Sequence, residues 1–357
     1  MNYTRLGNTG LFVSRFAFGT MTFGSDPRFP SVAKVDLASA KSMTDRALDA
    51  GINFFDTADG YSSGESEVYL GQFLGPRRKD VVVATKVGFR AGQPITQAGL
   101  SRRHIFEACN SSLQKLATDW IDLYIVHKVD AFTPLEETLD ALNDLVRSGK
   151  VRYIGFSNWP AWQAASALAI QKERGWAQFT SGQMYYSLLT RDLEHEFIPF
   201  LRATGTGMTV WSPLAGGFLS GKYTRENAQD KKEDKETRLG GGFDFIPFDR
   251  EAGFRVIDKM REIGRAHASS VAQVALAWLL AKPFITSVIL GASKMSQLED
   301  NLQAIDLKLL DSEIAALDEI SAPPVQYPNW FTAVTTDALH KDAATESSAR
   351  AASASST

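Results

Sequence analysis

The feature that most constrains the fold is a unit that recurs along the chain: a short apolar strand, a polar break and an amphipathic helix. In one unit, Asp36 is a typical helix N-cap, apolar residues follow at helical spacing, and Gly51 ends the helix before the apolar run of residues 52–55. Eight strand candidates end near Phe18, Phe55, Thr85, Val126, Phe156, Gly182, Trp211 and Leu290. Because helices alternate with these strands, the strands should be parallel, and eight of them predict a closed (β/α)8 TIM barrel of the α/β class.

Further segments frame the predicted barrel. A short N-terminal β-hairpin is expected from residues 4–6 and 12–13, which flank the turn sequence Gly-Asn-Thr-Gly. A charged, glycine-containing stretch over residues 224–250 suggests extended βα loops, and small polar residues dominate the end of the chain. Because no linker composition divides the chain, we predict a single barrel domain over residues 1–335 and a disordered tail over residues 336–357.

Charge and cysteine content narrow the classes of protein. The chain of 357 residues has a formal net charge of −3, which gives no reason to expect nucleic acid or an anionic membrane as a partner. Cys109 is the only cysteine, so an intrachain disulfide is impossible. The sequence begins without a charged-then-apolar leader and contains no apolar run long enough to cross a bilayer. These features predict a cytoplasmic protein that acts on a small molecule, and they leave its oligomeric state open.

Small or polar residues stand at the end of each predicted strand, where a parallel barrel gathers its functional groups. They are Gly19 with Thr20, Asp56, Lys86, His127, Ser157 with Asn158, Gln183, Ser212 and Gly291. At any single position, the more usual explanation is that a polar residue begins a loop. Asp56, Lys86 and His127, however, follow three consecutive strands, and His127 is the only histidine in such a position. We therefore predict a site at the carboxyl end of the barrel.

A tyrosine in the polar stretch after the second barrel strand adds a proton donor to this set. Tyr61 lies five residues beyond Asp56, among Gly, Ser and Asp residues that offer nothing to bury it. The pKa of a free tyrosine is near ~10, a nearby ammonium lowers it, and a carboxylate keeps that ammonium charged. A histidine can donate a hydrogen bond to a carbonyl oxygen as negative charge develops there. Such a site would protonate an oxygen, and because no side chain donates hydride, a nicotinamide cofactor would be required.

Several motifs, in one order, resemble those of the aldo-keto reductase superfamily from the N-terminal hairpin to about residue 320. They read DTADGY at 56–61, ATK at 84–86, IDLYIVH at 121–127, GKVRYIGFSN at 149–158, QMYYSLLTR at 183–191, WSPLAGGFLSGKY at 211–223 and GASKMSQLEDN at 291–301. The catalytic tetrad that the resemblance implies consists of Asp56, Tyr61, Lys86 and His127, with Tyr61 as general acid. The implied activity is reversible, NADPH-dependent reduction of an aldehyde or ketone to an alcohol, with hydride from nicotinamide C4.

By the same resemblance, the cofactor would bind along the carboxyl ends of the strands. Ser157, Asn158 and Gln183 would hold the nicotinamide carboxamide, and Trp211 would stack on its ring. The other implied contacts are Gly19, Thr20, Met21 and Asp56 near the first strands, Ser212, Pro213, Leu214, Gly216 and Lys222 under the pyrophosphate, and Gly291, Ser293, Lys294, Gln297 and Asn301 at the adenosine end. Some relatives carry Lys-Ser in place of Gly291-Ala292 and Arg in place of Gln297, so a preference for NADPH over NADH depends mainly on Lys294.

The substrate end of the site is the part that the sequence specifies least. Phe23, Phe89 and Trp159 follow the first, third and fifth strands, so they could line an apolar pocket beside the nicotinamide or pack beneath the loops. The expected substrate is an aldehyde or ketone with a sizeable apolar body, also contacted by Tyr61 and His127. A metal site is not expected, because the chain has one cysteine and no cluster of histidines.

The same motifs admit a second class of protein. The resemblance extends to cytoplasmic β subunits of potassium channels, which bind NADPH and act as regulatory partners. Tyr124 and Lys128 also match Y-x-x-x-K, the pair of short-chain dehydrogenases, but they lie in or next to an apolar strand, and no G-x-G-x-x-G occurs in the chain. An enzyme is favoured over a regulatory subunit, because the barrel hairpin is expected to begin at residue 2, with no long segment before it.

Overall fold

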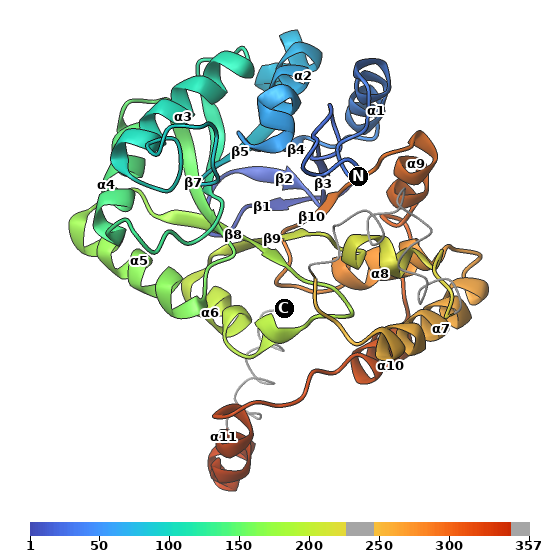
Figure 1. Ribbon diagram of the computed structural model, residues 1–357. Helices are drawn as coiled ribbons and strands as arrows, with labels where there is room; N and C mark the ends of the chain where they lie inside the picture. The colour runs from blue at the N-terminus through green and yellow to red at the C-terminus, as the bar shows by residue number, and fades with distance from the viewer. Residues whose placement is uncertain (226–245, 344–357) are drawn as a thin grey trace, which may run out of the picture.

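Eight parallel strands close into a barrel in the computed structural model, which describes residues 1–225 and 246–343. In chain order the strands are β3 (Phe16–Gly19), β4 (Phe54–Asp56), β5 (Val82–Val87), β6 (Ile121–Val126), β7 (Val151–Ser157), β8 (Phe179–Tyr185), β9 (Gly207–Trp211) and β10 (Ser287–Leu290). Each strand pairs in parallel with its sequence neighbour, and β10 pairs with β3 to close the circle. The predicted (β/α)8 TIM barrel is confirmed (Figure 1).

The predicted N-terminal hairpin covers the amino end of the barrel. Its strands β1 (Tyr3–Arg5) and β2 (Phe12–Ser14) pair antiparallel and lie across the middle of the barrel in Figure 1. Leu6 and Val13 are fully buried, and they pack against the inward side chains of β3, β4, β5 and β6. The Ser14 amide donates to Asn53 Oδ1, just before β4, at 2.7 Å. The amino end of the barrel is therefore closed by the hairpin.

Eight helices that follow the strands surround the barrel (Figure 1). They are α1 (Leu37–Asp49), α2 (Glu65–Leu74), α3 (Arg102–Lys115), α4 (Leu135–Arg147), α5 (Ala161–Arg174), α6 (Phe197–Thr204), α8 (Val271–Leu280) and α9 (Met295–Gln303). As the sequence predicts, Asp36 caps α1 by accepting a hydrogen bond from the Ser39 amide at 2.9 Å. An apolar stripe on the same helix, which includes Met43, is buried against the core.

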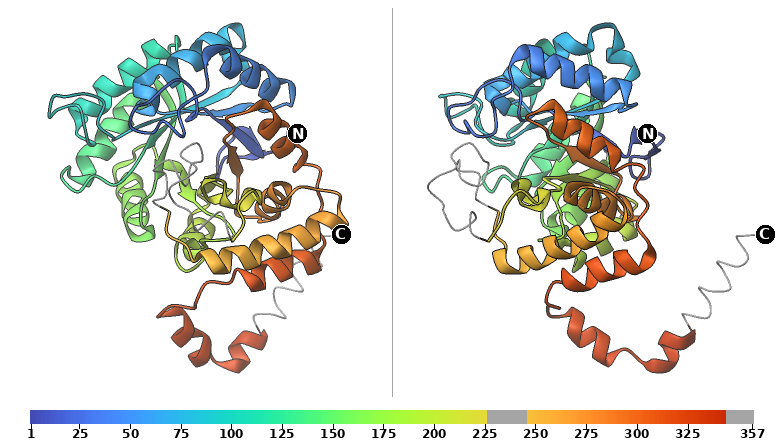
Figure 2. Two further views of the ribbon diagram at one scale, coloured as in Figure 1. Left: turned by 45° about the vertical axis from the view of Figure 1, so that its right-hand side comes forward. Right: turned by 90° about the vertical axis from the view of Figure 1, so that its right-hand side faces the viewer.

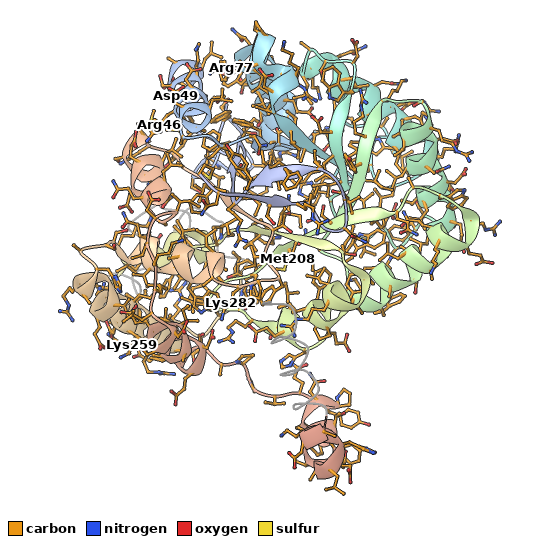
Figure 3. The ribbon with its side chains drawn as sticks, turned by 180° about the vertical axis from the view of Figure 1, so that it is seen from behind. Arg46, Asp49, Arg77, Met208, Lys259 and Lys282 are labelled. Atoms are coloured by element: carbon orange, nitrogen blue, oxygen red, sulfur yellow. The ribbon has the colours of Figure 1, made fainter. Side chains whose placement is uncertain are left out.

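Among the described residues, two helices outside the repeating unit lie against the barrel itself. Helices α7 (Arg250–Ala266) and α10 (Asp311–Ile320) pack against each other on the outside of the barrel. The ring of helices also closes on itself, because α1 packs against α9. Figure 3 labels Arg46 on α1, whose guanidinium forms an ion pair with Glu299 on α9 at 2.6 Å.

The C-terminal part of the chain leaves the barrel. Helix α11 (Asn329–Thr335) projects away from it in all three views of Figures 1 and 2, and residues 338–343 also have helical backbone, although the sequence predicts disorder from residue 336. The rest of the predicted tail and most of the irregular stretch 224–250 lie outside the described residues. Among the helices described, none combines the length and the apolar character that a membrane crossing needs.

Candidate active site

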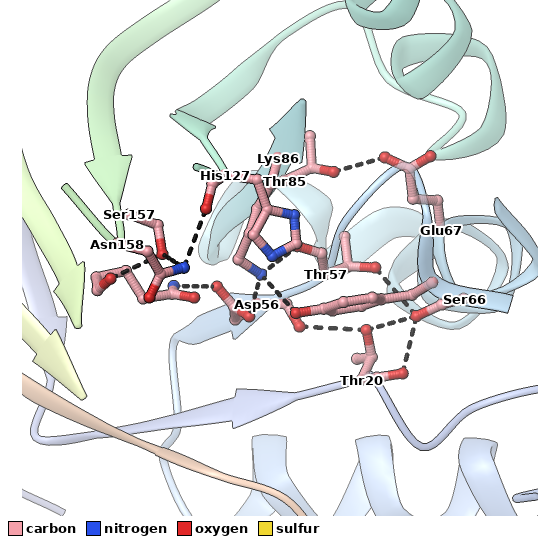
Figure 4. A network of polar contacts seen from close by, with 12 residues as sticks. Thr20, Asp56, Thr57, Ser66, Glu67, Thr85, Lys86, His127, Ser157 and Asn158 are labelled. Atoms are coloured by element: carbon pink, nitrogen blue, oxygen red, sulfur yellow. Dashed lines mark hydrogen bonds and ion pairs between the residues drawn. The ribbon is translucent and has the colours of Figure 1, made fainter. Parts of the chain in front are cut away.

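The structure brings the four residues of the predicted tetrad together at the carboxyl end of the barrel. Figure 4 labels three of them, Asp56, Lys86 and His127. Lys86 is the centre of the group, and its side chain is completely buried. Its ammonium donates to Asp56 Oδ1 at 2.6 Å, to the Thr57 carbonyl at 2.7 Å and to the Tyr61 hydroxyl at 3.2 Å. The prediction placed Lys86 just past the end of its strand, but β5 continues to Val87, so Lys86 points into the barrel from within the strand.

The direction of these hydrogen bonds determines what Tyr61 can do. An ammonium has three donors and no acceptor, so the Tyr61 oxygen must accept from Lys86. The phenolic proton of Tyr61 is therefore available to another acceptor. The ring of His127 stands beside the ring of Tyr61, with centroids 5.9 Å apart and planes at 76°. Both side chains line one cavity, where an acceptor would meet both of them.

A strained turn places Tyr61 in this position. Tyr61 begins the short 3-10 helix η1 (Tyr61–Gly64), and the next two residues, Ser62 and Ser63, have φ of 47° and 54°. Left-handed backbone costs a non-glycine residue roughly 1–2 kcal/mol. The Ser62 hydroxyl is held by the Phe23 carbonyl at 2.6 Å, which stabilises the turn against this cost. Only Gly64, at φ 95°, adopts such a conformation without a side-chain penalty.

Asp56 connects three strands of the barrel. One of its carboxylate oxygens accepts from Lys86 on β5, and the other accepts from Gln183 Nε2 on β8 at 2.7 Å. Although burial opposes a charge on Lys86, the Asp56 carboxylate and the Tyr61 oxygen outweigh it and raise the pKa of the lysine. Lys86 is therefore a fixed cation at neutral pH.

The protonation states of Tyr61 and His127 follow from burial. Burial raises the pKa of Tyr61, and the Lys86 ammonium lowers it by less, so the pKa lies above the ordinary tyrosine value. The sequence predicted the influence of Lys86 correctly but omitted burial, and the net direction it predicted is wrong for the protein alone. Burial, with the cations Lys86 and Lys128, holds the pKa of His127 well below the ordinary value. At neutral pH the phenol is protonated and the imidazole is neutral.

The predicted nicotinamide contacts form one hydrogen-bonded wall next to the tetrad. The Ser157 hydroxyl donates to the Gln183 carbonyl at 2.7 Å. Asn158, in left-handed backbone at φ 57°, donates to the His127 carbonyl at 3.0 Å and accepts from the Trp211 indole at 3.1 Å. Through Asn158, hydrogen bonds link the His127 backbone to the Trp211 indole at the end of β9. The candidate cofactor contacts and His127 therefore belong to one hydrogen-bond network.

One cavity of about 1080 Å³ contains nearly all the predicted cofactor contacts. Its lining includes Gly19, Met21, Asp56, Ser157, Asn158, Gln183, Trp211, Ser212, Pro213, Leu214, Gly216, Lys222, Gly291, Ser293, Lys294, Gln297 and Asn301. Thr20 is the exception, since it is fully buried and its hydroxyl bonds to the Ser66 hydroxyl at 2.7 Å (Figure 4). Gln297 contributes through the loop, because its Oε1 accepts from the backbone amides of Ser293 and Lys294 at 2.9 and 3.2 Å.

The cavity has features that suit a dinucleotide. It is long enough to run from the tetrad to Lys294, at the start of α9. Gly217 lies along it with φ 93°, and a Cβ added there would stand 3.7 Å from the Lys222 ammonium. A side chain at this position would stand in van der Waals contact with Lys222, so glycine leaves the backbone of this loop open to an anionic group. The residues present therefore fit a nicotinamide dinucleotide.

The three aromatic residues predicted near the substrate lie in different environments. Phe89 lines the cavity and is 45% exposed. Phe23 is fully buried and packs edge-to-face on Phe18, at a centroid distance of 5.8 Å, so it lies in the core. Trp159 is also buried and packs against Phe156 at 5.6 Å. For Phe23 and Trp159, the alternative of packing beneath the loops is the one the structure supports.

Several cavity residues were missed by sequence reasoning. Their common position is in or near the loops that follow β3, β5 and β6: Arg28, Phe29, Lys34, Arg90 and Lys128. For Arg90 and Lys128, the signal that could have identified them is a cation shortly after the end of β5 or β6. Arg28, Phe29 and Lys34 lie well beyond the end of β3 at Gly19, where no such signal exists. Sequence spacing alone does not show which loop side chains turn inward.

A second buried group of charges lies behind the tetrad and was also missed. Asp59 is buried and, in the described part of the chain, has no hydrogen-bond partner for either carboxylate oxygen. Burial and the nearby Glu67 raise the pKa of Asp59 to about 7. Glu67 accepts from the Thr85 hydroxyl at 2.6 Å and faces the Lys115 ammonium at 3.6 Å. Asp59 is also one of the groups that, after burial, raise the pKa of Tyr61.

Comparison with known proteins agrees with this geometry. The family model described as "Aldo/keto reductase family" matches residues 15–322. "Uncharacterized oxidoreductase YrpG" of Bacillus subtilis (strain 168) is 38% identical over 91% of this chain and 97% of its own. "Probable voltage-gated potassium channel subunit beta" of Oryza sativa subsp. japonica is 37% identical over 90% and 96%, and "Versiconal hemiacetal acetate reductase" of Aspergillus parasiticus is 33% identical over 92% and 99%. The chain therefore belongs to the aldo/keto reductase family.

Proposed function

We propose that the protein is an NADPH-dependent oxidoreductase that reversibly reduces an aldehyde or ketone to an alcohol. The observation that carries this proposal is the hydrogen bond from Lys86 to the Tyr61 oxygen, at 3.2 Å, in a cavity that His127 also lines. The bond leaves the phenolic proton free and holds a cation where a phenolate would form. Membership of the aldo/keto reductase family supports oxidoreductase chemistry of this kind.

The proposed cofactor contacts can be grouped by the part of NADPH that each would hold. Ser157, Asn158 and Gln183 would hold the carboxamide, and the indole of Trp211 would pack on the nicotinamide. The loop from Ser212 to Lys222 would hold the pyrophosphate, and Ser293 with Lys294 would hold the 2′-phosphate. When bound, NADPH supplies the hydride that the carbonyl carbon accepts.

The chain's own residues would provide the proton and stabilise the developing charge. Neutral His127 would donate a hydrogen bond to the substrate oxygen as negative charge grows on it. Tyr61 would transfer its proton to that oxygen, and the phenolate left behind would be stabilised by Lys86, itself held by Asp56. Water would then return a proton to Tyr61. In the reverse direction the phenolate would accept the proton of the alcohol.

A second candidate function is that of a regulatory β subunit which binds NADPH and turns over slowly or not at all. The relative from Oryza sativa named as a potassium channel subunit, at 37% identity, is the observation that favours it. The two candidates differ in turnover rather than in cofactor binding. A regulator would bind NADPH and oxidise at most about one equivalent per site.

The test is NADPH oxidation at catalytic protein concentration with a panel of aldehydes, cyclic ketones and quinones. The enzyme proposal expects many turnovers per site. Tyr61→Phe should lower kcat by roughly 10²–10⁴, the usual range for loss of a general acid, and should leave the Kd of NADPH nearly unchanged. Stoichiometric oxidation only would favour the regulatory subunit, and near-normal turnover by Tyr61→Phe would remove the phenol from the mechanism.

A further inference from the structure

The cavity that contains Tyr61 and His127 is also lined by residues that neither the tetrad nor the cofactor contacts explain. They are Arg28, Phe29, Lys34, Phe89, Arg90 and Lys128. They lie in the loops after β3, β5 and β6, whereas most of the proposed cofactor contacts follow β7, β9 and β10. Within this set, Phe89 packs against His127, whose ring stands beside the ring of Tyr61. A substrate would extend over this end of the cavity, next to Phe89, away from its carbonyl group.

Phe89 is the aromatic surface at this end. Its ring stands edge-to-face to the His127 ring, with centroids 4.6 Å apart and planes at 77°. Nearly half of the side chain, 45%, is exposed, although it is a large apolar group next to His127. Exposed aromatic area is stabilised when a ligand covers it, and a flat ring covers it best. A carbonyl group that reaches Tyr61 and His127 would bring an attached ring alongside Phe89.

The charge beyond Phe89 is positive. The Lys128 ammonium lies 5.6 Å from the centre of the Phe89 ring, on the side of its face. Arg90, next to Phe89, donates to the carbonyls of Gly92 and Pro94 at 3.0 and 2.9 Å, bonds that leave its charge unneutralised. Across the described residues, neither cation forms an ion pair.

Asp130 is an acid that interacts with Lys128, and its oxygens already accept hydrogen bonds. Asp130 accepts from the Leu100 amide and the Thr133 hydroxyl, both at 2.7 Å, and from the Phe132 amide at 3.0 Å. The Lys128 charge also favours the ionised form of Asp130. Counted together, Lys128, Arg90 and Asp130 carry one net positive charge. Arg28 differs, because it forms an ion pair with Asp26 at 2.7 Å.

We propose that the substrates of this protein are aromatic aldehydes or ketones that carry an anionic group, such as a carboxylate, on the ring away from the carbonyl. This inference rests on the reductase function proposed above. The carbonyl would lie at Tyr61 and His127, the ring on Phe89, and the anion at Lys128 and Arg90. The anion takes no part in the reaction: the carbonyl carbon gains hydride from the cofactor, its oxygen gains the Tyr61 proton, and the carboxylate is unchanged.

The test compares two substrates that differ in charge only at the distal group: para-carboxybenzaldehyde and its methyl ester. Wild-type protein should show a kcat/KM for the carboxylate about 10-fold above that for the ester, through KM, and the ratio should fall as ionic strength rises. Lys128→Gln and Arg90→Gln should each reduce the ratio by about 3- to 10-fold, since the charge is partly exposed. Lys79→Gln, an exposed lysine before β5 at the opposite end of the barrel, makes the same change in net charge and should leave the ratio as it is.

The outcomes separate this inference from the proposed function. If both aldehydes are reduced and the wild-type ratio is one or less, the reductase function stands and the anionic substrate class is wrong. If the variants weaken NADPH binding and leave the ratio unchanged, the cations serve the cofactor, and the inference is again overturned.

A binding measurement covers the case in which neither aldehyde turns over. Titration calorimetry with para-(hydroxymethyl)benzoate and its methyl ester, with and without NADP⁺, measures recognition without chemistry. Tighter binding of the carboxylate, lost in Lys128→Gln, would support the anion site even if the reductase function failed. Equal binding of the two would reject the anion site.

Discussion

At the scale of single residues, the candidate site depends on how many partners each buried polar group has. Lys86 uses all three of its donors, and Asp56 uses both of its carboxylate oxygens. Asp59, only three residues after Asp56, uses neither carboxylate oxygen among the described residues. Satisfied groups keep their ordinary charge in the core, whereas an unsatisfied acid takes up a proton.

Removing the Lys86 ammonium tests the coupling between this residue and Tyr61. In Lys86→Met, the pKa of Tyr61 should rise further, because the group that lowers it is gone. The kcat for reduction should fall by at least about 100-fold, since the phenolate loses its cation. The alkaline limb of the pH profile, which follows loss of the Tyr61 proton, should move to higher pH.

The companion variant Asp56→Asn should act in the same direction through the lysine that it holds. Steady-state kinetics across pH provides the measurement for both variants, and thermal unfolding controls for instability. A wild-type rate and pH profile in either variant would show that the residues are not coupled.

Asp59 should make the stability of the fold depend on pH. Its pKa is raised from 3.8 to about 7 in the folded chain. Below pH ~4 both states hold the proton and nothing is lost; between ~4 and ~7 the unfolded chain ionises first, so stability falls as pH rises. The total loss of unfolding free energy is on the order of 4 kcal/mol, and it is complete above the folded-state pKa of Asp59.

Asp59→Asn should remove this dependence, because an amide does not titrate. The variant should unfold at a higher Tm than wild type at pH 8 and at a similar Tm at pH 4. Asp119→Asn, at an exposed acid, is the matched control and should keep the wild-type slope. If Asp59→Asn and Asp119→Asn have the same pH dependence, Asp59 is ionised in the folded protein.

At the scale of elements, short turns decide what the strand ends present. Residues 62–64 are left-handed in sequence, and this turn directs Tyr61 back over Lys86. The loop before α9 is ordered in a different way, by Gln297, whose side chain accepts from two backbone amides. The two loops have different sequences, but each positions one side chain at the cavity.

Lys294, in the loop before α9, is expected to select NADPH. A charge-assisted contact to the 2′-phosphate contributes about 1.5–3 kcal/mol, which corresponds to roughly 10- to 150-fold in affinity. Lys294→Ala should weaken NADPH by about this factor, less at high salt, and should leave NADH nearly unchanged. Fluorescence titration measures the Kd of each cofactor for the wild-type protein and the variant.

Gln297→Ala provides the contrast, because it releases the loop backbone and should weaken both cofactors. Equal loss of both cofactors in Lys294→Ala would mean that the lysine only supports the loop. No loss of either would place the 2′-phosphate elsewhere.

At the scale of the whole molecule, the barrel is complete before the C-terminal segment begins. Leu317 is the last fully buried apolar residue, and every large apolar side chain described beyond Pro324 is exposed. Asn329 makes weak contacts with His195, at 3.3 and 3.4 Å, which connect α11 to the barrel.

A chain that ends at Pro324 should therefore keep its fold, with a Tm within about 2 °C of the full chain, since loss of an exposed segment costs little. Differential scanning calorimetry measures the difference. A fall of about 10 °C or more would show that α11 covers part of the barrel or joins two copies of the chain, and sedimentation would tell these apart.

The sequence by itself determined the barrel and predicted which four residues would meet at its carboxyl end. Strand and helix periodicity are local properties, and Asp56, Lys86 and His127 stand at consecutive strand ends, where parallel strands must converge. Tertiary structure alone decided which aromatic groups face the cavity. Phe23 and Phe89 both follow strand ends, but contacts with distant residues such as Phe73 bury only the first. It also decided the raised pKa values of Tyr61 and Asp59, because burial depends on chain segments that no local pattern brings together.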